Sequence, residues 1–140
     1  MKTLVFVSVV LCALIIGSVA WKTTAATDDQ KRTAITQFAN PVMLQGHVLK
    51  GTYLFVHDDA AMQRGEACTY IYKGEAEVRE KLVTSFHCIH VERTRAKSFV
   101  TRTRESAAGM MELTEFQFSG ETAGHGVPLP STFAVVPVAN

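Results

Sequence analysis

Short apolar-rich runs follow one another through most of the chain, and polar, turn-forming residues separate them at intervals of roughly ten residues. The runs are rich in β-branched and aromatic residues, as in 52–57 (TYLFVH), 68–73 (CTYIYK) and 111–118 (MELTEFQF). Outside the first 20 residues, no window keeps a helical period over three turns. The pattern predicts an all-β domain, a small antiparallel barrel or sandwich of about six to eight strands.

Further strands are predicted between these runs, at 41–45, 48–49, 82–91, 98–104 and 133–138. The segment 58–66 is polar and predicts a loop. The connection 74–81 has room for a short helical turn, because Glu77 and Lys81 are four residues apart. Pro137 limits the last run to an edge strand or to irregular structure.

The first 20 residues have the features of a secretory signal peptide. Lys2 precedes the uncharged segment 4–16, and the small residues Ser18 and Ala20 mark a cleavage site. Cleavage after Ala26 is a second possibility, and an uncleaved membrane anchor is the alternative, at the lower limit of length for a span. The segment 21–34 is predicted to be a flexible leader and 35–140 a single β domain.

The charge balance limits the classes of partner. The chain is 47% hydrophobic and 19% charged, typical of one folded domain. Without Lys2, basic and acidic residues are equal in number, which argues against a nucleic-acid-binding protein. We expect a protein of the periplasm, cell envelope or extracellular space with an unidentified envelope partner. It would contact a membrane only through an uncleaved N-terminal segment, as a signal-anchored protein of the inner membrane.

Two cysteines remain after removal of the signal segment, Cys68 and Cys88. A hairpin that pairs them would place Tyr70 opposite Phe86 and put both sulfurs on one face. In an oxidising compartment, this arrangement predicts a disulfide. The alternative is a pair of buried free thiols.

A metal site is a further alternative for the same region. Strand alternation would put Cys88 and His90 on one face with Cys68 opposite, and His47 or His57 could supply a fourth ligand. No Cys-x-x-Cys or comparable metal-binding spacing is present, so the sequence predicts no metal ion and no cofactor.

Three other polar segments are candidates for a functional site. His57-Asp58-Asp59 is interpreted as a solvated turn, and His125, between two glycines, as part of a flexible turn. Four arginines near Phe99 could bind an anionic glycan or a lipid headgroup, or could form the solvent face of a hairpin: Arg93, Arg95, Arg102 and Arg104.

No known catalytic motif occurs in the sequence, and no catalytic residue is predicted. The leading hypothesis is a non-enzymatic binding or structural module of the cell envelope. The alternatives are a small secreted hydrolase or metal-binding protein that uses His87, His90, Cys88 or His125, and the membrane-anchored envelope protein described above.

The segment 41–55 carries a resemblance. Pro41–Leu44, Gly46, Val48–Leu49 and Gly51–Tyr53 with Phe55 resemble a family of small exported bacterial proteins, frequent in acidobacteria, with a "VLPAGTYxF" signature. The similarity continues through Asp58, Arg64, 91–95, 101–103, 113–118 and 120–128. Lys50 replaces the Pro-Ala pair of the signature. The resemblance implies export and an all-β fold, and it implies no activity.

Overall fold

The computed structural model describes residues 31–129, which form mostly β-structure. The strands are β1 (Lys31–Leu44), β2 (His47–Asp58), β3 (Thr69–Lys73), β4 (Leu82–Phe86), β5 (Ile89–Glu92), β6 (Val100–Glu105), β7 (Met111–Gln117) and β8 (Ala123–Gly126). Two short helical segments lie between them, α1 (Asp59–Gln63) and the 3-10 turn η2 (Arg79–Lys81). The predicted β-class is therefore confirmed.

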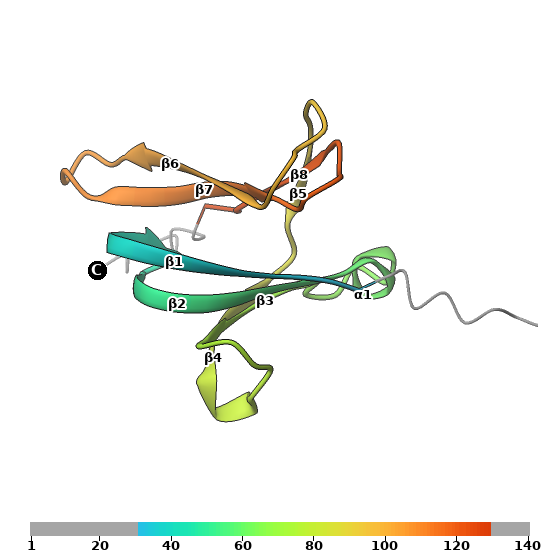
Figure 1. Cartoon of the computed structure of the whole chain (residues 1–140), viewed down its shortest axis with the longest axis horizontal. Coiled ribbons are helices and arrows are strands. Elements are labelled where there is room, and N and C mark those ends of the chain that lie inside the picture. The colour runs from blue at the N-terminus through green and yellow to red at the C-terminus, as the bar shows by residue number, and fades with distance from the viewer. Residues whose placement is uncertain (1–30, 130–140) are drawn as a thin grey trace, which may run out of the picture.

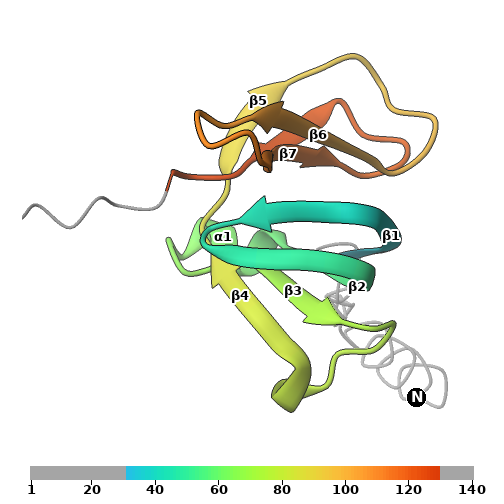
Figure 2. The ribbon, with the colours of Figure 1, turned by 90° about the vertical axis from the view of Figure 1, so that its left-hand side faces the viewer.

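The strands form one sheet, which curls like half a barrel. Its order is β4-β3-β2-β1-β7-β8-β5, and β6 pairs with β7. Figures 1 and 2 show the two halves facing each other, with β1–β4 on one side and β5–β8 on the other. Within residues 31–129, only the pairing of β1 with β7 joins the halves in the sheet, and this pair is parallel, unlike the antiparallel pairs elsewhere.

The β1–β2 hairpin is longer than predicted. β1 begins at Lys31 and pairs along most of its length with β2, so residues 31–34 are strand and not flexible leader. Little in the sequence indicates this strand, because the inward positions of 31–36 carry arginine, alanine and threonine in place of large apolar residues. Gln45 and Gly46, both with positive φ, make the tight turn between β1 and β2.

The predicted strand 82–91 is divided into β4 and β5, with His87 and Cys88 outside both. β3 and β4 form the predicted hairpin in a different register, with Thr69 opposite Phe86 and Tyr70 opposite Ser85. The break allows the chain to leave the first half of the sheet and enter the second. The shift by one residue means that Cys68 and Cys88 do not face each other as a cross-strand pair.

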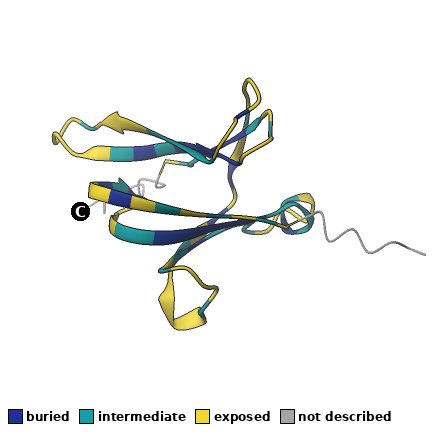
Figure 3. Cartoon of the chain, viewed as in Figure 1, coloured by how far each residue is buried: buried dark blue, intermediate teal, exposed yellow. Residues whose placement is uncertain are grey.

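The core lies between the two halves (Figure 3). Phe55 and Phe116 are fully buried, with ring centroids 5.3 Å apart, and they join β2 to β7. Phe99 and Phe118, with ring centroids 5.4 Å apart, extend the aromatic cluster. The stretch 53–57 of β2 is buried at every position, so this part of the strand is covered on both faces.

Two of the predicted connections contain short helical segments. The segment 58–66 contains α1, whose N-cap is Asp58: its carboxylate accepts hydrogen bonds from the backbone N–H groups of Ala60 and Ala61. η2 provides the helical turn expected in 74–81.

The predicted signal peptide, the leader up to residue 30 and the strand at 133–138 lie outside the described residues. Within residues 31–129, neither helical segment has the length and hydropathy needed to span a bilayer.

Candidate metal centre

Three buried side chains meet where the two halves of the sheet adjoin: His57, Cys88 and His125. The Cys88 sulfur lies 3.8 Å from Nδ1 of His57 and 3.5 Å from Nδ1 of His125. The three potential ligand atoms all lie within 4.8 Å of one another. Imidazole nitrogen and thiolate sulfur are the donors that zinc and copper prefer in proteins.

Separate elements place these side chains together. His57 occupies an inward position at the end of β2, after Phe55. Cys88 lies in the break between β4 and β5, and His125 lies in β8. Phe116 stacks on the His125 ring, with centroids 5.0 Å apart and planes at 14°. The aromatic core therefore fixes the orientation of His125 while the chain break brings Cys88 to it.

Carboxylates hold the outer nitrogen of each imidazole. Nε2 of His57 lies 2.9 Å from Asp59 Oδ1, and Nε2 of His125 lies 3.2 Å from Glu121 Oε2. A carboxylate accepts hydrogen bonds, so each Nε2 donates and each Nδ1 keeps its lone pair toward the sulfur. Arg32 pairs with both Asp59 and Glu121 and so connects the two carboxylates.

Burial controls the protonation of the cluster. It lowers the pKa of His125 to about 4, with a further contribution from Arg32, and it also lowers the pKa of His57. Burial raises the pKa of the Cys88 thiol to about 12, and the neighbouring Cys68 adds to this effect. Burial also raises the pKa of Glu121, and the positive charge of Arg32 opposes this shift. At neutral pH the imidazoles are therefore neutral, and the unliganded Cys88 thiol is a poor nucleophile.

Cys68 lies beside this cluster. Its sulfur is 3.5 Å from the Cys88 sulfur, and both thiols are free and buried. A disulfide bond requires about 2.05 Å between the sulfurs, so the predicted Cys68–Cys88 disulfide is not formed in this structure. The structure does bring the two sulfurs together, through the start of β3 and the break after β4.

Three of the histidines considered for a metal or hydrolase site do not belong to this cluster. His47, His87 and His90 are exposed, and Nδ1 of His87 lies 2.9 Å from the backbone carbonyl oxygen of Glu66. Of the residues considered for a metal set, Cys88, Cys68 and His57 come together. The interpretation of His57-Asp58-Asp59 as a solvated turn was wrong for His57, which is fully buried. His125 belongs to a strand and not to a flexible turn.

The four candidate arginines contact groups of the chain itself. Arg93 and Arg102 both pair with the buried carboxylate of Glu115, at 2.6 and 2.8 Å. Hydrogen bonding from Arg93 lowers the pKa of Glu115 and keeps it ionised. Arg104 pairs with Glu112, and Arg95 donates a hydrogen bond to the backbone carbonyl of Gly120. These contacts favour a structural role for the four arginines over a role as a free anion-binding surface.

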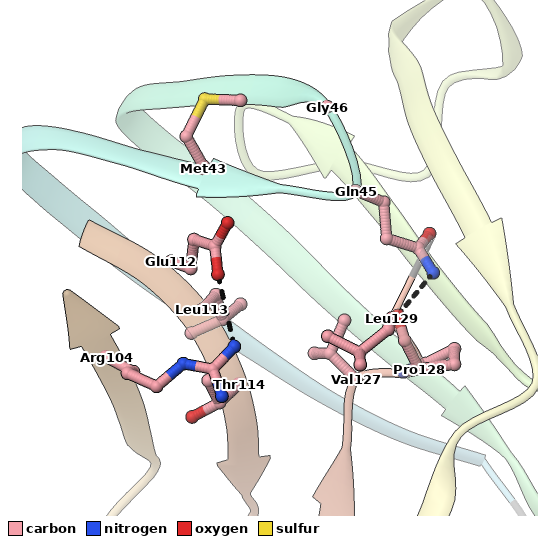
Figure 4. Close-up of a pocket in the computed structure, with 10 residues that line it drawn as sticks. All are labelled: Met43, Gln45, Gly46, Arg104, Glu112, Leu113, Thr114, Val127, Pro128 and Leu129. Carbon is pink, nitrogen blue, oxygen red and sulfur yellow. Dashed lines mark hydrogen bonds and ion pairs between the residues drawn. The ribbon is translucent and has the colours of Figure 1, made fainter. Parts of the chain in front are cut away.

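A small pocket near the β1–β2 turn has no comparable donor set (Figure 4). Among the described residues that line it, Arg104 pairs with Glu112, and the Gln45 side chain donates a hydrogen bond to the Pro128 carbonyl. None of these lining residues is a histidine or a cysteine. The buried cluster is therefore the stronger candidate site.

Comparison with known proteins assigns this chain to no family. The chain matches no protein-family model, no curated protein and no solved structure. Function must therefore be argued from the geometry of the cluster.

Proposed function

We propose that this chain is an exported, non-enzymatic binding module of the cell envelope whose ligand is a transition-metal ion such as Zn²⁺ or copper. The ligands are Nδ1 of His57, Nδ1 of His125 and Sγ of Cys88. The observation that carries the proposal is that both imidazoles turn Nδ1 toward one sulfur while a carboxylate holds each Nε2. A carboxylate behind a ligating histidine is usual in protein metal sites.

The distances support this ligand set. Tetrahedral coordination of zinc, with bonds of about 2.0–2.3 Å, places neighbouring nitrogen and sulfur ligands about 3.6 Å apart. The corresponding distances from Cys88 are 3.5 and 3.8 Å, so an ion could enter with small side-chain movements. A bound cation would also convert the Cys88 thiol to a thiolate despite its burial.

The alternative to a metal site is a hydrogen-bonded core cluster in which the Cys88 thiol donates to an imidazole. This arrangement also gives the carboxylates a role, as acceptors of the Nε2 protons, but the single S–H proton of Cys88 can be donated to only one of the two Nδ1 atoms that face the sulfur. It also leaves unexplained why two histidines, two carboxylates and an arginine are placed around one sulfur within a β-domain core. We therefore favour the metal site.

Titration of the purified, reduced protein with Co²⁺ tests the proposal. One equivalent should produce the absorption bands of tetrahedral Co²⁺ with a thiolate ligand, and Zn²⁺ should displace it. Cys88→Ser and His125→Gln should weaken binding at least tenfold, whereas His90→Gln, which changes an exposed histidine, should leave it unchanged. Circular dichroism establishes that each variant is folded. Absence of cobalt bands from the folded wild-type protein, or equal affinity in Cys88→Ser, would overturn the proposal.

A further inference from the structure

Cys68 is a second sulfur within reach of the candidate metal ligand Cys88, and the proposed metal set does not require it. The two sulfurs are 3.5 Å apart, and the backbone N–H of Cys88 points to the Cys68 sulfur at 3.4 Å. Both thiols are buried, and residues 31–129 contain no third cysteine that could compete with them. A pair placed in this way can form a disulfide if one sulfur moves.

The backbone around the pair identifies the residue that can move. Cys68 is held on both sides, because its N–H donates to the Phe86 carbonyl and its carbonyl accepts from the Asp58 N–H. Cys88 lies in the break between β4 and β5, where no strand pairing holds it. Small rotations at Cys88 can therefore bring its sulfur to Cys68 while β3 keeps its position.

We propose that Cys68 and Cys88 form a two-electron redox pair whose oxidation releases the metal ion. The Cys88 sulfur cannot serve both as a thiolate ligand and as half of a disulfide, so the two states exclude each other. The metal part rests on the proposed function, whereas formation of the disulfide does not. Oxidation would thus convert a metal-loaded centre into an empty, cross-linked one.

Hydrogen peroxide is a sufficient oxidant for this step. The Cys88 thiolate attacks one peroxide oxygen, the O–O bond breaks, and a sulfenic acid forms as a proton from solvent completes the first water molecule. Cys68 then attacks the Cys88 sulfur, the S–S bond forms, and the sulfenic oxygen leaves with the Cys68 proton as a second water molecule. The two sulfurs lose two electrons, the peroxide gains them, and the metal departs as the unchanged cation.

Peptide mapping provides the first readout. The zinc-loaded full chain is treated with peroxide, alkylated and digested with trypsin, which cleaves after Arg64, Lys73, Lys81 and Arg93. The expected product is residues 65–73 linked to residues 82–93, lighter by two hydrogen atoms than the separate peptides. A chromophoric chelator should report release of the zinc in parallel. Dithiothreitol should restore both the free thiols and zinc binding.

Two variants make the test decisive. Cys12→Ser, which removes the remaining cysteine, should behave as the wild type. Cys68→Ser lacks the resolving thiol, so Cys88 should gain oxygen atoms and dithiothreitol should no longer restore binding. The inference fails if wild-type protein yields no linked peptide, or if the linked form holds zinc as tightly as the reduced form. If reduced protein binds no metal and yet yields the linked peptide, the proposed function fails and the redox pair stands.

Discussion

Neutralising Glu121 should weaken metal binding without removing a ligand. Glu121 accepts a hydrogen bond from Nε2 of His125, and its negative charge increases the electron density at Nδ1. In Glu121→Gln an acceptor oxygen remains and the charge is lost. Removal of such an outer carboxylate costs about 10- to 100-fold in metal affinity, which corresponds to about 1.4–2.7 kcal/mol.

The structure also ranks the two carboxylates. The Glu121 side chain is 14% exposed and that of Asp59 is 30% exposed, so solvent screens the charge of Asp59 more effectively. We therefore expect Glu121→Gln near the upper end of this range and Asp59→Asn near the lower end. Glu112→Gln is the matched control, because it neutralises a surface glutamate paired with Arg104.

The assay is competition for Zn²⁺ between each reduced variant and a chromophoric chelator, at fixed pH and ionic strength. Urea unfolding without metal separates a loss of affinity from a loss of stability. The reasoning is refuted if Glu121→Gln and Glu112→Gln bind zinc with the same affinity as the wild type. A larger effect from Asp59→Asn than from Glu121→Gln would refute the ranking by burial.

Three further predictions concern the stability of the fold around the site. Phe116→Ala should lower the free energy of unfolding by about 3–5 kcal/mol, measured by urea denaturation, because it empties the space between Phe55 and His125; a loss below 1 kcal/mol would contradict this role. Gly124→Ala should cost about 1–3 kcal/mol, since a Cβ there would collide with the Glu115 carboxylate; unchanged stability would show that β8 can yield. Because Arg93 lowers the pKa of Glu115 in the folded state, its contribution is present above the unfolded value near 4.3 and is lost as the pH falls through the folded value. Glu115→Gln should therefore reduce the fall in stability on acidification, and an unchanged pH profile would exclude Glu115 as its source.

The β-class could be predicted from the sequence because each strand carries its own local signal. The run 52–57 lies within β2, and residues 111–117 of the run 111–118 form β7. The positions where prediction failed depend on distant contacts. Residues 31–34 are strand because β2 pairs with them, and the break at 87–88 arises because the chain passes from one half of the sheet to the other.

The candidate site was recognised in part for the same reason. Cys68 and Cys88 stood out as a pair, and strand alternation allowed His57 to be considered as a ligand. His125 was considered only beside His87 and His90, and Gly124 and Gly126 suggested a turn there, whereas both glycines lie in β8, and a side chain at Gly124 would collide with Glu115. A signal was available at His57: it directly follows the continuous apolar run 53–56, which is typical of a strand buried on both faces.

The location of the cluster connects its chemistry to the architecture of the sheet. His57 and Cys68 belong to the first half, His125 and Glu121 to the second, and Cys88 to the passage between them. Within the described residues, strand pairing joins these halves through β1 and β7 at the opposite end of β1 from Arg32. At the Arg32 end, the ion pairs of Arg32 with Asp59 and Glu121 and the cluster itself make the connection. A metal ion at His57, Cys88 and His125 would therefore fasten the end of the curled sheet that hydrogen-bonded strands leave open, and a Cys68–Cys88 disulfide would fasten only the first half to the passage.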